Sequence, residues 1–149
     1  MIGLLLFRPV IAARHKFFAP IGDARISVVD VRDIAAAATV ALVEPGHEGK
    51  TYDLTGPEAL THTEMASRIA HALGKKVDFV EVSEQEMREA LASWHVPEWQ
   101  IEGVLEDYQH YRSGGGADVS TTIQDLTGRP PRDFTSFAEN FREALRAAT

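Results

Sequence analysis

The spacing of apolar residues along the chain predicts a protein rich in helices. The clearest helical period lies near the C-terminal end, where Phe134, Phe137, Ala138, Phe141 and Leu145 recur every three or four residues. Similar periods predict about six helices, with a further short helical piece at 123–126. The main predicted helices cover residues 2–14, 61–73, 83–94, 97–108 and 134–145, and the first of them is interrupted near Pro9. Another predicted helix begins at Asp30 or Asp33 and ends at about residue 43.

Short runs of β-branched and aromatic residues predict three or four strands. They lie at Lys16–Phe18, Arg25–Val29, Thr51–Leu54 and Val77–Val82, each next to a turn or a helix start. So few and scattered strands do not make a doubly wound sheet by themselves. We therefore expect a single domain over residues 1–149, of the α/β class with α+β character and dominated by helix.

Two of the predicted helices begin with a capping box. Thr61 and Glu64 have the required spacing for the first, and Ser83 and Glu86 for the second, so that each pair satisfies two free backbone N–H groups. Gly74 suits the left-handed residue that ends the first of these helices.

Composition narrows the classes of function. The net charge of −7 disfavours nucleic-acid binding, and the absence of cysteine excludes disulfides and thiolate chemistry. The apolar start, Met1–Phe7, is too short to span a membrane and lacks the features of a signal peptide, so a cytoplasmic protein is expected. Such an abrupt apolar start also suggests a chain that begins within a larger fold.

The motifs of a nicotinamide-dependent reductase are missing. The eleven glycines include no G-x-G-x-x-G, and residues 46–51 resemble a phosphate loop but place Glu44 where its first glycine belongs. The nearest approach to Tyr-x-x-x-Lys runs from Tyr108 to Arg112, and His110 has acidic neighbours one turn away but no second histidine. We predict no catalytic, cofactor-binding or metal-binding residues.

Aromatic residues around a helix break give the best candidate for a ligand site. Trp94 and Trp99 flank the break at Pro97, and Tyr108 and Tyr111 would join them if the following helix folds back. Tryptophan offers a large apolar face and one N–H donor, which suits the wall of a small-molecule pocket. The alternative is that both tryptophans simply fill the joint between two helices.

A charged group follows the second predicted strand. Asp30, Arg32 and Asp33 are interpreted as a helix cap with a local ion pair. The alternative is a hinge-like contact that fixes the helix against a neighbouring domain.

Three segments in order resemble one family. Residues 18–35, including the run Ile26–Ala35, resemble the segment after the last Rossmann crossover in NmrA-like atypical short-chain dehydrogenases/reductases. Residues 49–61 are similar to their next strand, turn and capped helix, and residues 126–137 to their C-terminal end.

The resemblance implies the C-terminal, substrate-side lobe of a two-part molecule whose N-terminal Rossmann half binds NAD(P)H. Met1 then resembles an internal methionine, and the chain a truncated member of this oxidoreductase family. We expect a lobe that binds a small apolar or aromatic ligand, or that dimerises, without catalysis or cofactor of its own. The alternatives are half of a reductase completed by a separate nucleotide-binding chain, and a regulatory interaction module. An exposed apolar face should promote self-association, through residues 2–14 among others.

Overall fold

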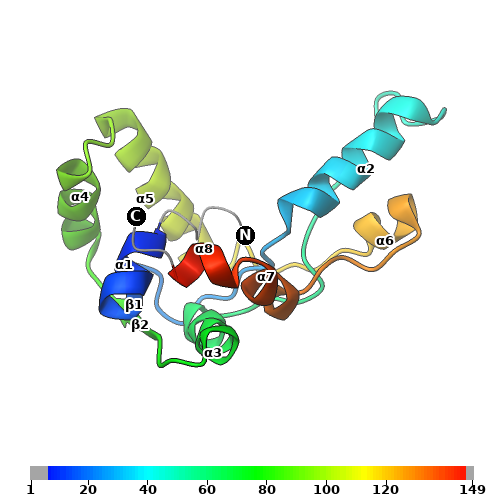
Figure 1. Cartoon of the computed structure of the whole chain (residues 1–149). Helices are drawn as coiled ribbons and strands as arrows, with labels where there is room; N and C mark the ends of the chain where they lie inside the picture. Colours follow the sequence, from blue (N-terminus) through cyan, green and yellow to red (C-terminus); the bar gives the residue numbers. More distant parts are fainter. Residues whose placement is uncertain (1–6, 147–149) are drawn as a thin grey trace.

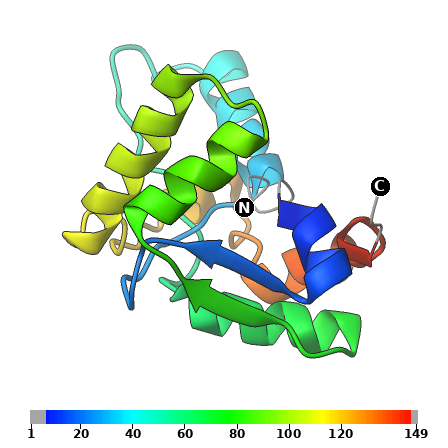
Figure 2. The same ribbon diagram turned by 90° about the vertical axis from the view of Figure 1, so that its left-hand side faces the viewer.

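The fold centres on two short parallel strands covered by helices on both sides. The structure, a computed structural model, describes residues 7–146. Strand β1 (Lys16–Ala19) pairs in parallel with β2 (Asp78–Glu81), so that Phe17 lies opposite Phe79. Figure 2 shows α3 (His62–Leu73) below the strands and the pair α4 (Glu84–Ser93) and α5 (Glu98–Arg112) above them. The described residues therefore form the helix-rich α/β fold that the sequence predicts.

The main core lies between α3 and the two ends of the described chain. Helix α1 (Arg8–Arg14) packs on α8 (Arg142–Arg146), and α7 (Phe134–Asn140) packs on α3. Ile11, Phe17, Ile69, Phe137 and Leu145 are almost completely buried there. The apolar stripes that predict these helices thus face one another.

A second, smaller core holds α4 against α5. Met87 and Leu91 from α4 meet Ile101 and Leu105 from α5, and all four side chains are buried. Because this cluster is separate from the main core, the helix pair forms its own wall beside the strands.

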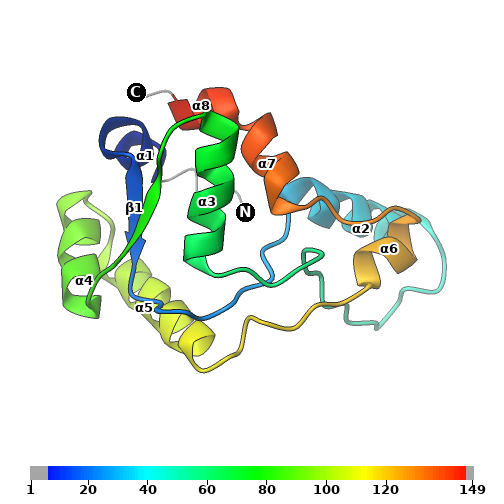
Figure 3. The same cartoon turned by 90° about the horizontal axis from the view of Figure 1, so that it is seen from below.

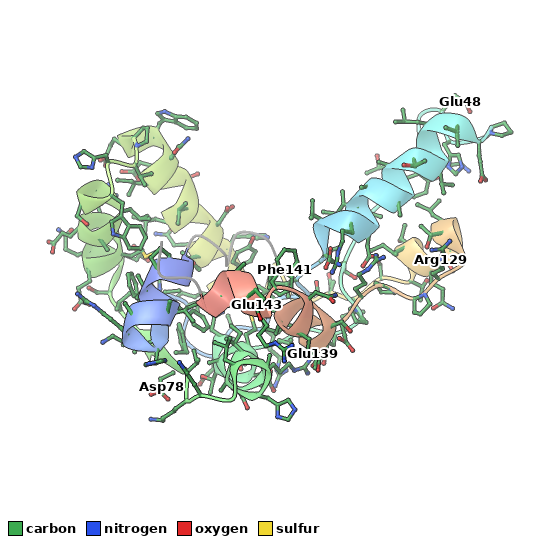
Figure 4. The ribbon with its side chains drawn as sticks, viewed as in Figure 1. Glu48, Asp78, Arg129, Glu139, Phe141 and Glu143 are labelled. Carbon is green, nitrogen blue, oxygen red and sulfur yellow. The ribbon has the colours of Figure 1, made fainter. Side chains whose placement is uncertain are left out.

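Helix α2 (Val31–Val43) and α6 (Thr122–Thr127) project from the opposite side of the molecule (Figure 1). They lie side by side, as Figure 3 also shows, and contact mainly each other. Glu48, just beyond α2, and Asp78 in β2 mark opposite ends of the molecule in Figure 4. Leu42 and Val43 at the end of α2 are 85% and 72% exposed, so this arm carries an apolar surface open to water.

The predicted helix boundaries are largely confirmed. Both capping boxes form, with Thr61 accepting from Glu64 and Ser83 accepting from Glu86, and Gly74 ends α3 with a left-handed φ of 64°. Pro97 stands at the N-cap of α5 instead of within its first turn.

Two predicted strands are wrong. Residues 25–29 form a single bridge, between Ile26 and Leu60, and residues 51–54 form no ladder in the described part of the chain. The Thr51–Leu54 stretch has a strand-like composition, but its backbone meets no neighbouring strand there. Gly56 donates to Ser27 O, and the Ser120 hydroxyl donates to Asp53 O.

Two helix predictions also need correction. The predicted helix over 134–145 is broken at Phe141, the C-cap of α7, so that α7 and α8 are separate. Of the predicted helix over 2–14, residues 8–14 form α1, whereas residues 2–6 lie outside the described residues. None of the helices within residues 7–146 is long and apolar enough to cross a membrane.

Candidate functional site

A pocket of about 490 Å³ opens between the strands, α3 and the α4–α5 pair. This volume lies within the range of small-molecule sites. Most of its wall is apolar, and residues from several elements contribute to it. Representative wall residues are Phe17 and Phe18 of β1, Met65 of α3, Met87 and Leu91 of α4, and Val104 of α5.

Local structure explains why Trp94 reaches this pocket. The residue is the C-cap of α4, and His95 follows it with a left-handed φ of 60°, so the chain turns sharply before α5. The Trp94 ring lies 6.0 Å from Phe7 and 6.1 Å from Phe18, measured between ring centroids. The helix break therefore places an aromatic face at the pocket wall.

A few polar side chains interrupt the apolar wall. They are His62 at the first turn of α3 and Asp107, Tyr108 and Tyr111 of α5. The rings of His62 and Tyr108 lie 6.3 Å apart, and those of Tyr108 and Tyr111 lie 6.5 Å apart. An apolar pocket with a small number of polar groups is typical of sites that orient a ligand.

Burial keeps two side chains of this pocket, His62 and Tyr108, uncharged at neutral pH. Desolvation lowers the pKa of His62 to about 4, because burial disfavours the charged imidazolium. Desolvation, with the nearby Tyr111 and Asp107, raises the pKa of Tyr108 to about 12. At neutral pH both side chains therefore offer uncharged hydrogen-bonding groups.

Three of the four aromatic residues predicted for a ligand site line this pocket. Trp94, Tyr108 and Tyr111 contribute to its wall, whereas Trp99 is 74% exposed and lies outside the wall. Trp99 differs because it stands in the first turn of α5, on the side that faces water.

The other candidate residues of α5 have structural partners. The Arg112 guanidinium lies 3.5 Å from the carboxylate of Glu84, and His110 Nε2 lies 3.1 Å from Gly115 O. Within residues 7–146, no three histidine or acidic side chains gather as a metal site would require. Residues 46–51 form an exposed turn instead of a loop at a helix N-terminus.

The charged group at the start of α2 is a cap with two ion pairs. Asp30 accepts from Arg32 N and pairs with the Arg32 guanidinium at 2.6 Å, as the sequence predicts. Asp33 is buried and accepts from the backbone N–H and the guanidinium of Arg132. Asp33 thereby fixes α2 to the segment ahead of α7.

Sequence reasoning missed His62 as a pocket residue. His62 lies inside the capping sequence between Thr61 and Glu64, and its spacing along α3 also carries a usable signal. His62 stands three residues before Met65 and seven before Ile69, which places all three on the buried face of α3.

Comparisons with known proteins point to one group of reductases, although no family model matches the chain. An NAD(P)H azoreductase of Xenophilus azovorans is 35% identical over 148 residues, which cover 99% of this chain and 52% of the relative. Quinone oxidoreductase 2 of Escherichia coli is 34% identical over 132 residues, which cover 89% of this chain and 45% of the relative.

Solved structures give the same result. The crystal structure of an NADPH-dependent quinone oxidoreductase from Escherichia coli superposes with a TM-score of 0.85 at 29% identity, covering 94% of this chain and 51% of that one. Triphenylmethane reductase of a Citrobacter species gives a TM-score of 0.75 at 28% identity, covering 97% and 48%. The chain spans about half the length of the relatives it matches and corresponds to their C-terminal half. In sequence and fold the chain matches the C-terminal half of these reductases, in agreement with its resemblance to NmrA-like proteins.

Proposed function

We propose that this chain is the substrate-side lobe of an NAD(P)H-dependent reductase and that its pocket holds a planar aromatic substrate. The observation that carries the proposal is the pocket itself, whose wall combines aromatic and aliphatic side chains with a few polar groups. Such a wall favours ligands with a large apolar face, because burial of that face removes it from water.

The names of the relatives support this substrate class. They include an azoreductase, a quinone oxidoreductase and a reductase of triphenylmethane dyes. Azo compounds, quinones and triphenylmethane dyes are all conjugated, ring-containing molecules. A pocket lined by Trp94 and Tyr108 suits the faces of such rings.

The residues present do not fit the nicotinamide dinucleotide that the relatives use. Its pyrophosphate needs a glycine-rich loop at a helix N-terminus, and the sequence has no G-x-G-x-x-G. In the described part of the chain, the pocket wall contains the Asp107 carboxylate and no lysine or arginine, which disfavours phosphate. We therefore assign no step through the cofactor to these residues.

The two tryptophans allow a direct test of the pocket. Titration with 1,4-naphthoquinone, followed by two-dimensional NMR of the indole N–H groups, should move the Trp94 signal and leave the Trp99 signal in place. The absence of cysteine removes thiol addition to the quinone as a complication.

A matched pair of variants tests the same point by affinity. Trp94→Ala should weaken naphthoquinone binding about tenfold, because a face of the pocket is lost. Trp99→Ala should leave the affinity unchanged, since Trp99 lies outside the pocket wall. Equal effects of the two substitutions would contradict the proposed site.

A second candidate function is association through α2. Leu42 and Val43 are highly exposed, and Val31 and Ile34 of the same helix are 43% and 39% exposed. Exposed apolar surface of this kind promotes binding to another protein surface. We propose that it binds a second copy of this chain or a nucleotide-binding half.

A further inference from the structure

His62 contains a buried polar atom that the fold leaves without a partner. Its side chain is 7% exposed, and within the described residues Nδ1 is the buried side-chain polar atom that lacks a hydrogen bond. Buried polar groups are nearly always satisfied in folded proteins, because an unsatisfied one costs stability. The described residues supply no partner for this nitrogen, so a bound molecule has to provide one.

His62 is one of the residues that line the pocket, so a ligand bound there would lie beside its ring. The ring stands at the pocket wall, with its centroid 5.9 Å from that of Phe17, 5.2 Å from that of Phe79 and 6.3 Å from that of Tyr108. These neighbours are aromatic faces that supply apolar contact. The Asp107 carboxylate also lies at the wall and is the acidic side chain among the described residues that line the pocket.

The imidazole has the chemistry to bind either a carbonyl or a hydroxyl group. A neutral imidazole carries one N–H donor and one nitrogen lone pair. It can therefore donate to a quinone oxygen or accept from a phenolic hydroxyl. A hydrogen bond made inside an apolar pocket discriminates strongly against a ligand that lacks the oxygen.

We propose that His62 hydrogen-bonds an oxygen substituent of the planar aromatic ligand and so selects quinones, phenols and naphthols over plain aromatic hydrocarbons. The inference rests on the proposed function, because it assigns a specificity-determining residue to the same pocket. His62 positions the ligand and selects it, and no part in proton transfer is assigned to it.

The test compares two ligands of nearly the same shape, 1-naphthol and 1-methylnaphthalene, against the wild-type chain and His62→Phe. Phenylalanine keeps a planar ring at the position and removes both ring nitrogens. The ratio of the two affinities should shift about tenfold toward 1-methylnaphthalene in the variant, while 1-methylnaphthalene itself still binds.

A second measurement needs no variant. In wild-type protein labelled with ¹⁵N, 1-naphthol should shift the ring-nitrogen resonances of His62, and 1-methylnaphthalene should leave the hydrogen-bonding state of that ring unchanged. A merely structural histidine would respond equally to both ligands.

The outcomes separate the two proposals. If both ligands bind with the same affinity ratio in wild type and His62→Phe, and the His62 resonances respond equally to both, the role of His62 is overturned and the pocket stands. If neither ligand moves the Trp94 indole signal of the wild-type chain, the proposed pocket fails and the role of His62 fails with it.

Discussion

At the scale of single residues, the molecule keeps a histidine in a place that favours an uncharged side chain. The His62 ring sits among aromatic rings of β1, β2 and α5, so a positive charge there would lose its hydration. This arrangement links the stability of the fold to pH.

We predict that His62 makes the chain less stable as the pH falls from about 6.5 to about 4. The pKa of His62 in the folded chain is about 4, below the ordinary value of 6.5, so the unfolded chain binds the proton more readily. Between pH 7.5 and pH 4.5 the free energy of unfolding should fall by about 2–3 kcal/mol from this group.

Urea unfolding at the two pH values, for wild type and His62→Phe, measures this contribution. The phenylalanine variant should lose correspondingly less stability on acidification. Asp30 and Asp133, whose pKa values their hydrogen bonds lower, lose their contributions at still lower pH and are common to both proteins. The same loss of stability in both proteins would contradict the prediction.

The site residues differ in how visible they are in the sequence. Trp94, Tyr108 and Tyr111 could be predicted because aromatic residues near a helix break are conspicuous, and the break brings Trp94 onto β1. Trp99 has the same local pattern, but the side of α5 on which it lies depends on how that helix packs. His62 is hard to recognise as a pocket residue from the sequence, because it lies between the two capping residues of α3 and its position is already explained by the helix start.

At the scale of elements, local capping chemistry fixes the helix starts. Thr61 accepts from Glu64 N at 3.1 Å, and the Glu64 carboxylate accepts from Thr61 N at 2.8 Å. The same carboxylate pairs with Arg25, which ties the start of α3 to the preceding segment. The orientation of His62 toward the pocket depends on this helix start.

We predict that Thr61→Ala destabilises the chain by about 1 kcal/mol, because one backbone N–H at the start of α3 loses its acceptor. Thr63→Ala is the matched control, since Thr63 is exposed and lies two residues further on. Its effect should stay within about 0.5 kcal/mol. Chemical denaturation of both variants checks this, and equal losses would show that the cap does not hold α3.

The helices could be predicted and two of the strands could not, for a physical reason. A capped amphipathic helix such as α3 satisfies its own backbone and needs only one packing face. A strand also needs a neighbour. Among the described residues, 25–29 form one bridge and isolated backbone hydrogen bonds at Ser27, and the backbone of 51–54 accepts a hydrogen bond from the Ser120 side chain without forming a ladder. Composition alone cannot say where that neighbour is.

At the scale of the whole molecule, the arm of α2 and α6 stands apart from the pocket. Its apolar end, with Leu42 and Val43, lies away from the main core (Figure 1). A surface on this arm can bind another protein without covering the pocket between β1 and the α4–α5 pair.

We predict that the chain self-associates at tens of micromolar and that Leu42→Glu with Val43→Glu reduces this association. Charges on the exposed apolar end oppose its burial against another surface. Sedimentation velocity over a range of concentrations measures the effect, with Ala92→Glu and Ser93→Glu at two exposed positions of α4 as a control for added charge. A wild-type chain that stays monomeric would contradict binding to a second copy of this chain through α2.

The most direct test of the account is a parallel titration of the purified chain with 1,4-naphthoquinone and with NADPH, followed by the signals of Trp94 and Trp99. A substrate-side lobe should give saturable quinone binding that moves the Trp94 signal, and no saturable response to NADPH into the millimolar range. Saturable NADPH binding, or a quinone that leaves Trp94 unaffected, would contradict the assignment of this pocket to the substrate.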